Sequence, residues 1–216
     1  VYAKELPNIP TAQRRETEIT IPGRDGTIYT TYGDYESTTI TIPFNFICDA
    51  EEWDERWGVV KKWLSARYRR LQLSTDPEHF YKVSKVELED AEHTTARIGN
   101  LKAKFTTIDG LRYLLEGQNE HTAEDVRYNP YEVAHPIYMI YGEGKCVLTV
   151  NGKTMTADVG QNITIDTDRE LAYRKDKLSN TAVSGKYDDL YLQEGENEIT
   201  ITEGFDLKII PNWRCL

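Results

Sequence analysis

The second half of the chain is a succession of short β-strand patterns, and this feature constrains the fold more than any other. Segments rich in β-branched and aromatic residues alternate with turn residues, which is typical of strands in an all-β domain. They are Ile137–Tyr141, Cys146–Val150, Lys153–Ala157, Asn162–Asp166, Ala172–Lys175, Tyr187–Leu192, Asn197–Ile201 and Asp206–Ile210. Asn151-Gly152 is the strongest hairpin signal, because both residue types accept the positive φ of a type I′ turn. The pattern predicts a β-sandwich.

The first half predicts an α+β arrangement in the order β-β-β-α-β-β. Two or three strands are predicted within residues 17–47, and the last of them is Thr38–Ile47. A helix and a turn at Thr75–Glu78 follow, and then strands around Phe80–Glu89 and Ala96–Thr107. Residues 110–128 are polar and are predicted to form a loop or linker. Pro43 favours an edge or a bulge for the strand that contains it, because proline donates no ladder hydrogen bond.

The single predicted helix runs from about Asp49 to Arg69. One face repeats at helical spacing and carries Trp53, Trp57, Val60, Leu64 and Tyr68. Asp49 is the predicted N-cap, and the basic residues Arg67, Arg69 and Arg70 suit the other end of the helix dipole. A tryptophan-rich stripe can form a ligand platform, but helical spacing favours a helix that covers one face of a sheet.

The texture of the sequence changes at Asn129-Pro130, where the helical signal stops. We therefore predict two domains in a mainly β protein. The N-terminal α+β domain covers residues 1–126 and the C-terminal β-sandwich covers residues 127–216.

A turn near the N-terminus provides the candidate site. Ile21-Pro22-Gly23-Arg24-Asp25-Gly26 lies between flanks that alternate Ile and Tyr with Thr and Glu, which is the period of a half-buried strand. Pro-Gly suits the centre of a type II turn, and Asp-Gly suits a loop with positive φ. Only Arg24 and Asp25 are not required for this shape, so they are the candidate assembly contacts. The alternative is a tight turn with no further role.

Composition excludes several classes of protein. The 216 residues carry a formal net charge of −10, which argues against a surface built to bind nucleic acid. The longest apolar runs, such as Ile137–Tyr141, are far too short to span a bilayer, so no membrane partner is expected. Cys48, Cys146 and Cys215 match no zinc motif and are interpreted as reduced thiols, although a Cys146–Cys215 bridge stays open.

A search for catalytic and metal-binding motifs returns none, so we expect no enzyme activity, no cofactor and no metal site. Gly142–Lys145 lacks the spacing of a phosphate-binding loop and is interpreted as a turn. Asp166, Asp168 and Glu170 alternate like calcium ligands, but Leu171 stands where a calcium loop needs glycine. His79, His93, His121 and His135 show no ligand spacing.

The order of these turns and strands resembles the distal tail protein (Dit) family of long-tailed bacteriophages or prophages. The matching features are Arg14-Arg15, Ile21–Gly26, Phe44-Asn45-Phe46, Lys62-Trp63-Leu64, Leu71–Asp76 before Tyr81, Asn129-Pro130, His135–Gly144, Val147–Gly152, Leu192–Ile201 and Pro211-Asn212-Trp213-Arg214. Each is mainly turn chemistry, and their order and spacing together carry the resemblance. The chain differs from the family in lacking the usual residues before Val1 and any long insertion in its second half.

The resemblance implies a structural virion protein at the distal end of a phage tail. Its N-terminal domains would form a homo-hexameric ring, with a galectin-like β-sandwich outside. The implied partners are the tail tube protein, a tail-tip or fibre protein and a receptor-binding protein, with DNA passing only as cargo. Assembly would take place in the cytoplasm of the bacterial host. We expect an acidic ring lumen, which would repel DNA phosphates.

An alternative function is carbohydrate binding by the second half, as part of an adhesion device. Stacking on a sugar requires exposed aromatic rings, and the candidates are Tyr138, Tyr141, Tyr173, Tyr187 and Tyr191. The cluster of polar and aromatic residues typical of galectins does not occur in one strand pair. The scaffold function is therefore favoured, because a fold alone does not imply an activity.

Overall fold

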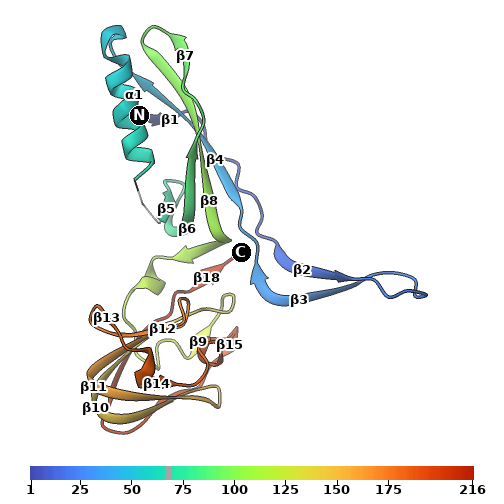
Figure 1. The fold of residues 1–216 in the computed structure, drawn as a ribbon, viewed down its shortest axis with the longest axis vertical. Coiled ribbons are helices and arrows are strands. Elements are labelled where there is room, and N and C mark those ends of the chain that lie inside the picture. Colours follow the sequence, from blue (N-terminus) through green and yellow to red (C-terminus); the bar gives the residue numbers. More distant parts are fainter. Residues whose placement is uncertain (67–69) are drawn as a thin grey trace. The chain divides into compact units, whose positions relative to one another are not determined.

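The computed structural model describes residues 1–66 and 70–216. The protein is mainly β, as predicted, and the described residues form one α-helix and several antiparallel sheets (Figure 1). The chain makes two compact units. The first comprises Val1–Arg112 and Leu216, and the second comprises Tyr113–Cys215.

The units divide earlier than the predicted boundary between residues 126 and 127. Val126 is fully buried in the core of the second unit. The backbone of His121 exchanges two hydrogen bonds with Ile209, of 2.7 and 2.9 Å. Residues 113–126 therefore belong to the second unit, although their polar composition made them resemble a linker. That each unit folds as an independent domain stays a prediction.

The first unit is built on an antiparallel sheet with the strand order β1-β4-β8-β6-β5, and β7 pairs with β8. The strands are β1 (Tyr2–Ala3), β4 (Thr39–Ile47), β5 (Arg70–Leu73), β6 (Asp76–Leu88), β7 (Glu92–Thr95) and β8 (Ile98–Leu114). β4 pairs with β8 continuously from Thr39↔Thr106 to Ile47↔Ile98, so segments distant in sequence form the centre of the sheet.

In this sheet the predicted strands are confirmed as β4, β6 and β8, of which β6 and β8 are longer than expected. β6 begins at Asp76, because Leu73 and Asp76 pair directly and close a turn at Ser74-Thr75. The predicted turn at Thr75–Glu78 is therefore wrong. β8 continues to Leu114, and the 3₁₀ turn η2 (Glu116–Gln118) follows it, so the predicted loop at 110–128 is also partly ordered structure.

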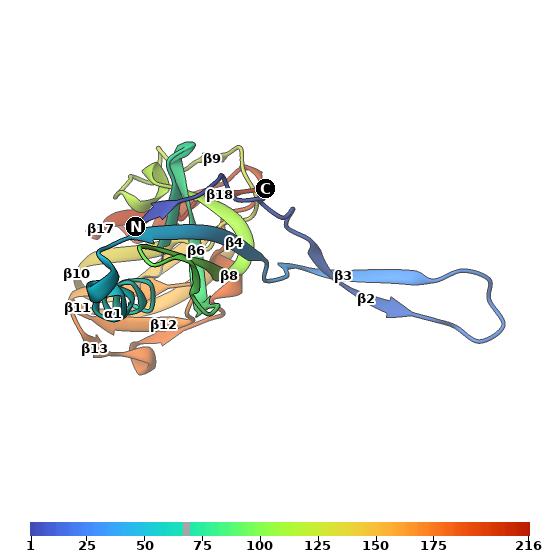
Figure 2. The ribbon, with the colours of Figure 1, turned by 90° about the horizontal axis from the view of Figure 1, so that it is seen from above.

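The helix α1 (Trp53–Leu64) covers this sheet through the predicted stripe (Figure 2). Trp53, Val60 and Leu64 are buried, and Trp57 packs against the same core. The 3₁₀ turn η1 (Ala50–Glu52) precedes α1, so Asp49 caps that turn rather than the α-helix, and its side chain makes no capping hydrogen bond. Arg70 lies in β5. Arg67, Tyr68 and Arg69 lie outside the described residues.

Phe46 of β4 anchors the contact between helix and sheet. Its ring stacks on Trp57 with centroids 6.1 Å apart and packs at 5.4 Å against Trp53. A Cβ atom on Gly99 of β8 would lie 2.3 Å from the Phe46 ring, closer than packed atoms can approach. Glycine at position 99 therefore makes room for the aromatic cluster beneath α1.

The second unit is organised by one long hairpin. β10 (Ile137–Val150) and β11 (Lys153–Asp166) pair along their whole length, from Ile137↔Asp166 to Val150↔Lys153. Asn151 and Gly152 connect them with φ of 51° and 77°, so the predicted type I′ turn is confirmed in position and sign of φ.

The segments predicted as four short strands are thus two long ones. Gly142–Lys145 is not a turn, because Gly142 pairs with Gln161 and Lys145 pairs with Asp158 inside the ladder. Gly142 has φ +148°, and the Phe205 ring lies where its side chain would be. Positive φ at Gly142, Gly144 and Gln161 marks an irregular stretch midway along the hairpin. From the sequence alone, Gly142 and Gly144 predict a turn between two strands.

The remaining elements of the second unit are short. They are β9 (Tyr128–Asn129), β12 (Leu171–Arg174), β13 (Lys177–Leu178), η3 (Asn180–Ala182), β14 (Val183–Ser184), η4 (Asp188–Leu190), β15 (Gly195–Glu196), β16 (Ile199–Ile201), β17 (Asp206–Ile210) and β18 (Arg214–Cys215). The predicted strand Tyr187–Leu192 is therefore wrong, since its centre is the 3₁₀ turn η4. Leu190 is fully buried there without belonging to a strand.

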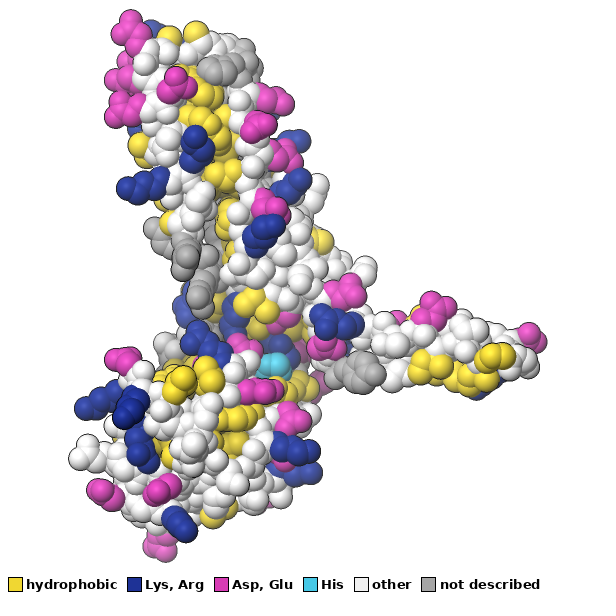
Figure 3. Space-filling view, in the orientation of Figure 1, with side chains coloured by type: hydrophobic (Ala, Val, Ile, Leu, Met, Phe, Trp, Pro, Cys, Tyr) yellow, Lys and Arg dark blue, Asp and Glu magenta, His cyan; other side chains and the backbone are white. Residues whose placement is uncertain are grey.

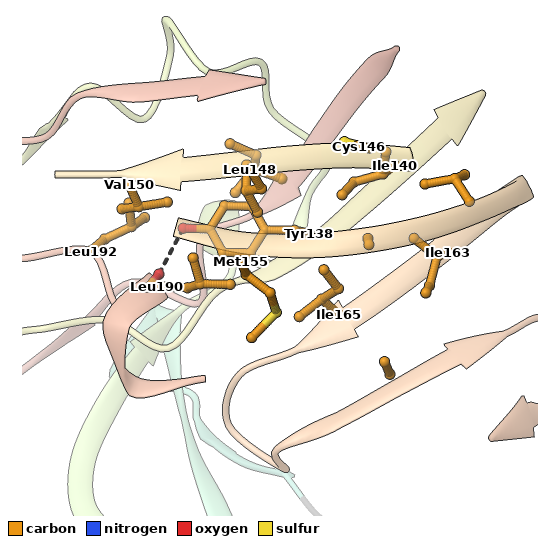
Figure 4. Packing of buried hydrophobic residues seen from close by; sticks show 14 of the residues in the cluster. Tyr138, Ile140, Cys146, Leu148, Val150, Met155, Ile163, Ile165, Leu190 and Leu192 are labelled. Carbon is orange, nitrogen blue, oxygen red and sulfur yellow. Dashed lines mark hydrogen bonds between the residues drawn. The ribbon is translucent and has the colours of Figure 1, made fainter. Parts of the chain in front are cut away.

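Both ends of β10 contribute to a single core (Figure 4). Tyr138 and Leu148 are both fully buried, and both belong to the same set of alternating inward positions. The hydroxyl of Tyr138 donates a 2.8 Å hydrogen bond to the carbonyl oxygen of Leu190. The strand order β13-β12-β11-β10-β16, with β14 and β17 beside β11 and β10, makes one sheet that folds over this core. Its galectin-like character stays a prediction.

Candidate assembly arm

The hairpin of β2 (Arg14–Ile19) and β3 (Ile28–Tyr35) is the candidate functional site. We call residues 14–35 the arm. Its strands pair with each other in a separate two-stranded sheet. In both views the arm extends away from the sheet that α1 covers (Figure 1; Figure 2). It is therefore the part of the first unit best placed to contact another molecule.

The arm has no core of its own. All six residues of β2 are exposed, although their alternation with polar residues predicted a half-buried strand. That prediction is wrong, because the structure places no third layer over the hairpin among the described residues. Two-stranded hairpins are marginally stable in water. A long exposed hairpin therefore needs either a firm base or a partner.

The tip of the arm is the predicted turn. The backbone amide of Arg24 donates to the carbonyl oxygen of Ile21 at 3.2 Å. Gly23 has φ +83°, the value that a type II turn requires after Pro22. Gly26 has φ +84°. The turn chemistry read from the sequence is thus confirmed.

Arg24 and Asp25 both lie exposed at this tip. A Cβ atom on either neighbouring glycine, Gly23 or Gly26, would meet nothing within 4 Å. The structure thus leaves open space around the two charged residues, but their role as assembly contacts stays a prediction.

The arm also exposes apolar side chains that are not among the contact residues predicted from the sequence. Ile19, Ile21 and Tyr29 are 44%, 42% and 63% exposed, and hydrophobic atoms gather toward the tip (Figure 3). Tyrosine is enriched among the interface residues that carry most of the binding energy, and the buried cores of interfaces are apolar. The alternation of Ile and Tyr in the flanks marks these apolar side chains in the sequence, but the alternation predicts that they are buried within the protomer.

The base of the arm is tied to the first unit. Tyr35 is only 6% exposed. The side chain of Arg14 donates from Nε to the Tyr35 hydroxyl at 3.2 Å. The amide of Glu36 donates to the carbonyl oxygen of Gln13 at 2.8 Å. Both legs of the hairpin are therefore joined just outside the main sheet.

A second cluster fixes the base to β8. The buried Thr107 hydroxyl accepts hydrogen bonds from the amides of Thr38 and Gly110, at 3.1 and 3.0 Å. The Thr107 amide donates to the Thr38 carbonyl at 2.8 Å. Gly110 has φ +71°, and a Cβ atom there would lie 2.8 Å from Thr38 and 3.2 Å from Ala12. The residues before and after the arm thus pack tightly on one point of β8.

An apolar cavity of about 400 Å³ forms another exposed surface of the first unit. Its lining includes Ile42, Phe44, Leu71 and Leu73. Trp63, which lies off the buried helix stripe, is 47% exposed at this cavity and meets Phe44 edge-on at 6.2 Å. Such a surface is typical of interfaces and of ligand clefts.

Two of the three acidic residues considered as calcium ligands, Asp166 and Asp168, have other partners. Asp166 is buried and accepts the Arg169 amide at 3.1 Å, and Asp168 pairs with His135 at 3.2 Å. Within the described residues, no group of three His, Cys, Asp or Glu side chains is arranged to hold a metal ion.

Cys48 and Cys146 are free, buried thiols in the structure, so no Cys146–Cys215 bridge is present. Burial raises the pKa of the Cys146 thiol, although hydrogen bonds with Thr202 oppose that effect.

The tyrosines considered for sugar stacking are mostly covered. Tyr138 is fully buried, so its ring is not available to a ligand. Tyr191 is half-buried and stacks on His135 with centroids 4.0 Å apart. Burial also raises the pKa values of Tyr173, Tyr187 and Tyr191. Only Tyr141 of this set is exposed, at 38%. Carbohydrate binding stays an untested alternative.

The fold of the chain is similar to that of solved protein structures. The fold is similar over almost the whole chain to the crystal structure of SPP1 Dit (gp 19.1), described as a paradigm of the hub adsorption apparatus in phages that infect Gram-positive bacteria. The TM-score is 0.61, the sequence identity is 14%, and the match covers 96% of this chain and 91% of SPP1 Dit. The two proteins thus share a fold.

The other searches find no relative. No protein-family model matches the chain, and no curated protein matches it. In the part of the chain that the structure describes, no helix is long and apolar enough to cross a membrane.

Proposed function

We propose that this chain is a structural protein of the distal end of a bacteriophage tail. It would act as a hub that assembles as a homo-hexameric ring and joins the tail tube to tail-tip, fibre and receptor-binding proteins. Its role would be non-enzymatic. It would be assembled in the cytoplasm of the bacterial host and reside in the virion.

The observation that carries the proposal is the likeness to SPP1 Dit across both units, 96% of this chain. A likeness confined to one unit would fit many proteins, because small β domains serve unrelated functions. A match across both units in the same order supports a shared architecture and thereby a shared role as a hub.

The arm supports the ring. A closed ring needs a heterologous interface, in which one surface of a subunit meets a different surface of its neighbour. The arm offers exposed Ile19, Ile21 and Tyr29 beside charged Arg24 and Asp25. We propose that these residues contact a neighbouring subunit or the tail tube, with the apolar groups providing affinity and the charges fixing the register.

The acidic net charge of −10 supports a further part of the proposal. DNA that leaves the tail would pass through the ring lumen, and an acidic lining would repel its phosphates. A reconstruction of the ring that shows a lumen lined by Lys and Arg would refute this part.

The experiment is a mass measurement of the native assembly. Native mass spectrometry should find a species of six times the 24.9 kDa protomer, and negative-stain images should show rings. The double variant Arg24→Ala, Asp25→Ala should stay folded by circular dichroism while the ring population falls. An unchanged ring would contradict the assigned contacts.

A matched control removes the same pair of charges elsewhere in the first unit. Asp54 and Arg56 are exposed on α1, so Asp54→Ala, Arg56→Ala should leave the ring population at the wild-type level. Equal loss in both double variants would indicate a general charge effect rather than a contact at the tip. A wild-type protein that stays monomeric at high concentration would count against self-assembly.

A further inference from the structure

The two strands of the arm do not pair in one continuous register. Near the tip the pairing is regular from Ile19↔Ile28 to Glu16↔Thr31. The next pair is Arg14↔Tyr35. Between these pairs β2 contributes only Arg15, whereas β3 contributes residues 32–34. β3 therefore carries two residues more than a regular ladder would hold.

These extra residues form a bulge centred on Gly33. Gly33 has φ +84°, and its amide donates to the Thr31 hydroxyl at 3.2 Å. A Cβ atom there would meet nothing within 4 Å. Arg15 and Asp34 form a 3.0 Å ion pair at this point. Bulges interrupt the ladder and bend the strand that contains them.

The parts on either side of the bulge are held very differently. Toward the main sheet, Tyr35 is buried and Thr38 shares hydrogen bonds with Thr107 of β8. Toward the tip, every residue of β2 is exposed and Tyr29 is 63% exposed. We call residues 16–31 the blade. Among the described residues, the blade is held by its own ladder and by a hydrogen bond from the Thr27 hydroxyl to Glu18, whereas the base is bonded to the sheet.

We infer that the bulge at Gly33 is a hinge, about which the blade turns as a unit on a fixed base. Hinges are short segments that absorb backbone rotation between two stiffer parts. Gly33 lies in open space at a φ that suits glycine, while the Arg15–Asp34 pair is exposed and weak enough to break and re-form. The hinge lets the tip adjust to a partner surface. That use rests on the proposed function, whereas the motion does not.

Pairs of spin labels in the first unit test the hinge through distance distributions. Lys102→Cys on β8 is combined with Tyr29→Cys in the blade or with Ser37→Cys at the base, in a Cys215→Ser background. We expect a broad distribution for the blade pair and a narrow one for the base pair. Broad distributions for both would overturn the inference, because motion would then begin at the base. A narrow blade distribution would also overturn it.

Two further samples separate a hinge from a frayed hairpin. Labels at Glu16→Cys and Thr27→Cys, at opposite ends of the blade, should give a narrow distribution if the blade moves as a unit. A broad one would mean that the blade unravels. Deletion of Gly33 and Asp34 leaves one residue on each strand between the pairs Glu16↔Thr31 and Arg14↔Tyr35, so the register becomes continuous. This deletion should narrow the Lys102–Tyr29 distribution to the width of the base pair, and a distribution that stays broad would place the hinge elsewhere.

The proposed function is read separately, by native mass spectrometry of the unlabelled wild type and the unlabelled deletion variant, because the label at Tyr29 replaces a proposed contact. The distances themselves are recorded on protein diluted until only the protomer is present. Failure of the unlabelled wild type to form a ring would count against the proposed function alone, because the distances are measured on the protomer. Deletion of the bulge should reduce ring formation if the tip must adjust. A deletion variant with a narrow distance distribution and an intact ring supports the hinge and contradicts its use in assembly.

Discussion

The arm and the β10–β11 hairpin are built from similar sequence but occupy opposite environments. Each has alternating side chains and a connection that contains glycine. Along β10, Tyr138, Ile140, Cys146, Leu148 and Val150 are all fully buried. Along β2, every residue is exposed. Alternation therefore specifies a strand in both places, but burial depends on whether other strands cover one face.

The same difference separates the roles of the two hairpins. β10–β11 is bordered by further strands and holds the core of the second unit. The arm is tied to the main sheet at its base. Exposed apolar groups that cover nothing in the protomer are typical of interaction sites. The contrast thus places structural stability in one hairpin and candidate contacts in the other.

The largest expected difference between the two hairpins is in the loss of stability when an apolar side chain is shortened to alanine. Leu148→Ala removes a fully buried side chain and should lower the free energy of unfolding of the second unit by about 2–5 kcal/mol. Ile19→Ala should change protomer stability by less than about 0.5 kcal/mol, because its side chain is largely solvated. Urea denaturation with hydrogen exchange measures both. A large loss from Ile19→Ala would mean that the arm has a core after all.

A smaller effect is expected at the glycines. A Cβ atom on Gly142 would lie 2.4 Å from the Phe205 ring, so Gly142→Ala should destabilise the second unit by about 1–3 kcal/mol. Gly26→Ala has a similar problem with positive φ but open space around it. Its strain should stay within the arm. Hydrogen-exchange protection should fall along β10 and β11 for the first variant and only near the tip for the second.

Local features were predictable from the sequence. The helix stripe of Trp53, Val60 and Leu64 and the turns at Asn151-Gly152 and Pro22-Gly23 depend on residues adjacent on one element. Spacing and backbone preference therefore suffice to find them. For the same reason the tip of the candidate site was found, including the exposed positions of Arg24 and Asp25.

Features that depend on distant partners were not predictable. The strand β10 runs through Gly142 and Gly144 because β11 continues opposite them, and no local pattern reveals that. Leu190 lies in the 3₁₀ turn η4 and is nevertheless buried, so an apolar residue at this position does not indicate a strand. The exposure of Ile19 and Tyr29 was missed because the absence of a covering layer is a tertiary property.

The smallest expected effect is a pH-dependent change in stability, which is compared between an aspartate of the main sheet and an aspartate of the arm. Asp76 accepts a 2.6 Å hydrogen bond from His79 and lies 3.3 Å from Arg112. The His79 bond, followed by the charges of His79 and Arg112, lowers the pKa of Asp76 below its usual value of 3.8, although burial opposes the shift. The carboxylate therefore adds stability that is present above the unfolded pKa and is lost as pH falls through the lower folded pKa.

Asp76→Asn should accordingly destabilise the first unit by less than about 1 kcal/mol above about pH 5, because the pair is partly solvated. The difference from wild type should shrink as the pH falls below about 4. Asp25→Asn removes the same charge from the exposed tip and should leave unfolding unchanged across this range. Urea midpoints measured from pH 6 to pH 3 decide the matter. A pH-dependent loss from Asp25→Asn would show that the tip, like the sheet, is held by contacts within the protomer, and would remove the ground for assigning it to assembly.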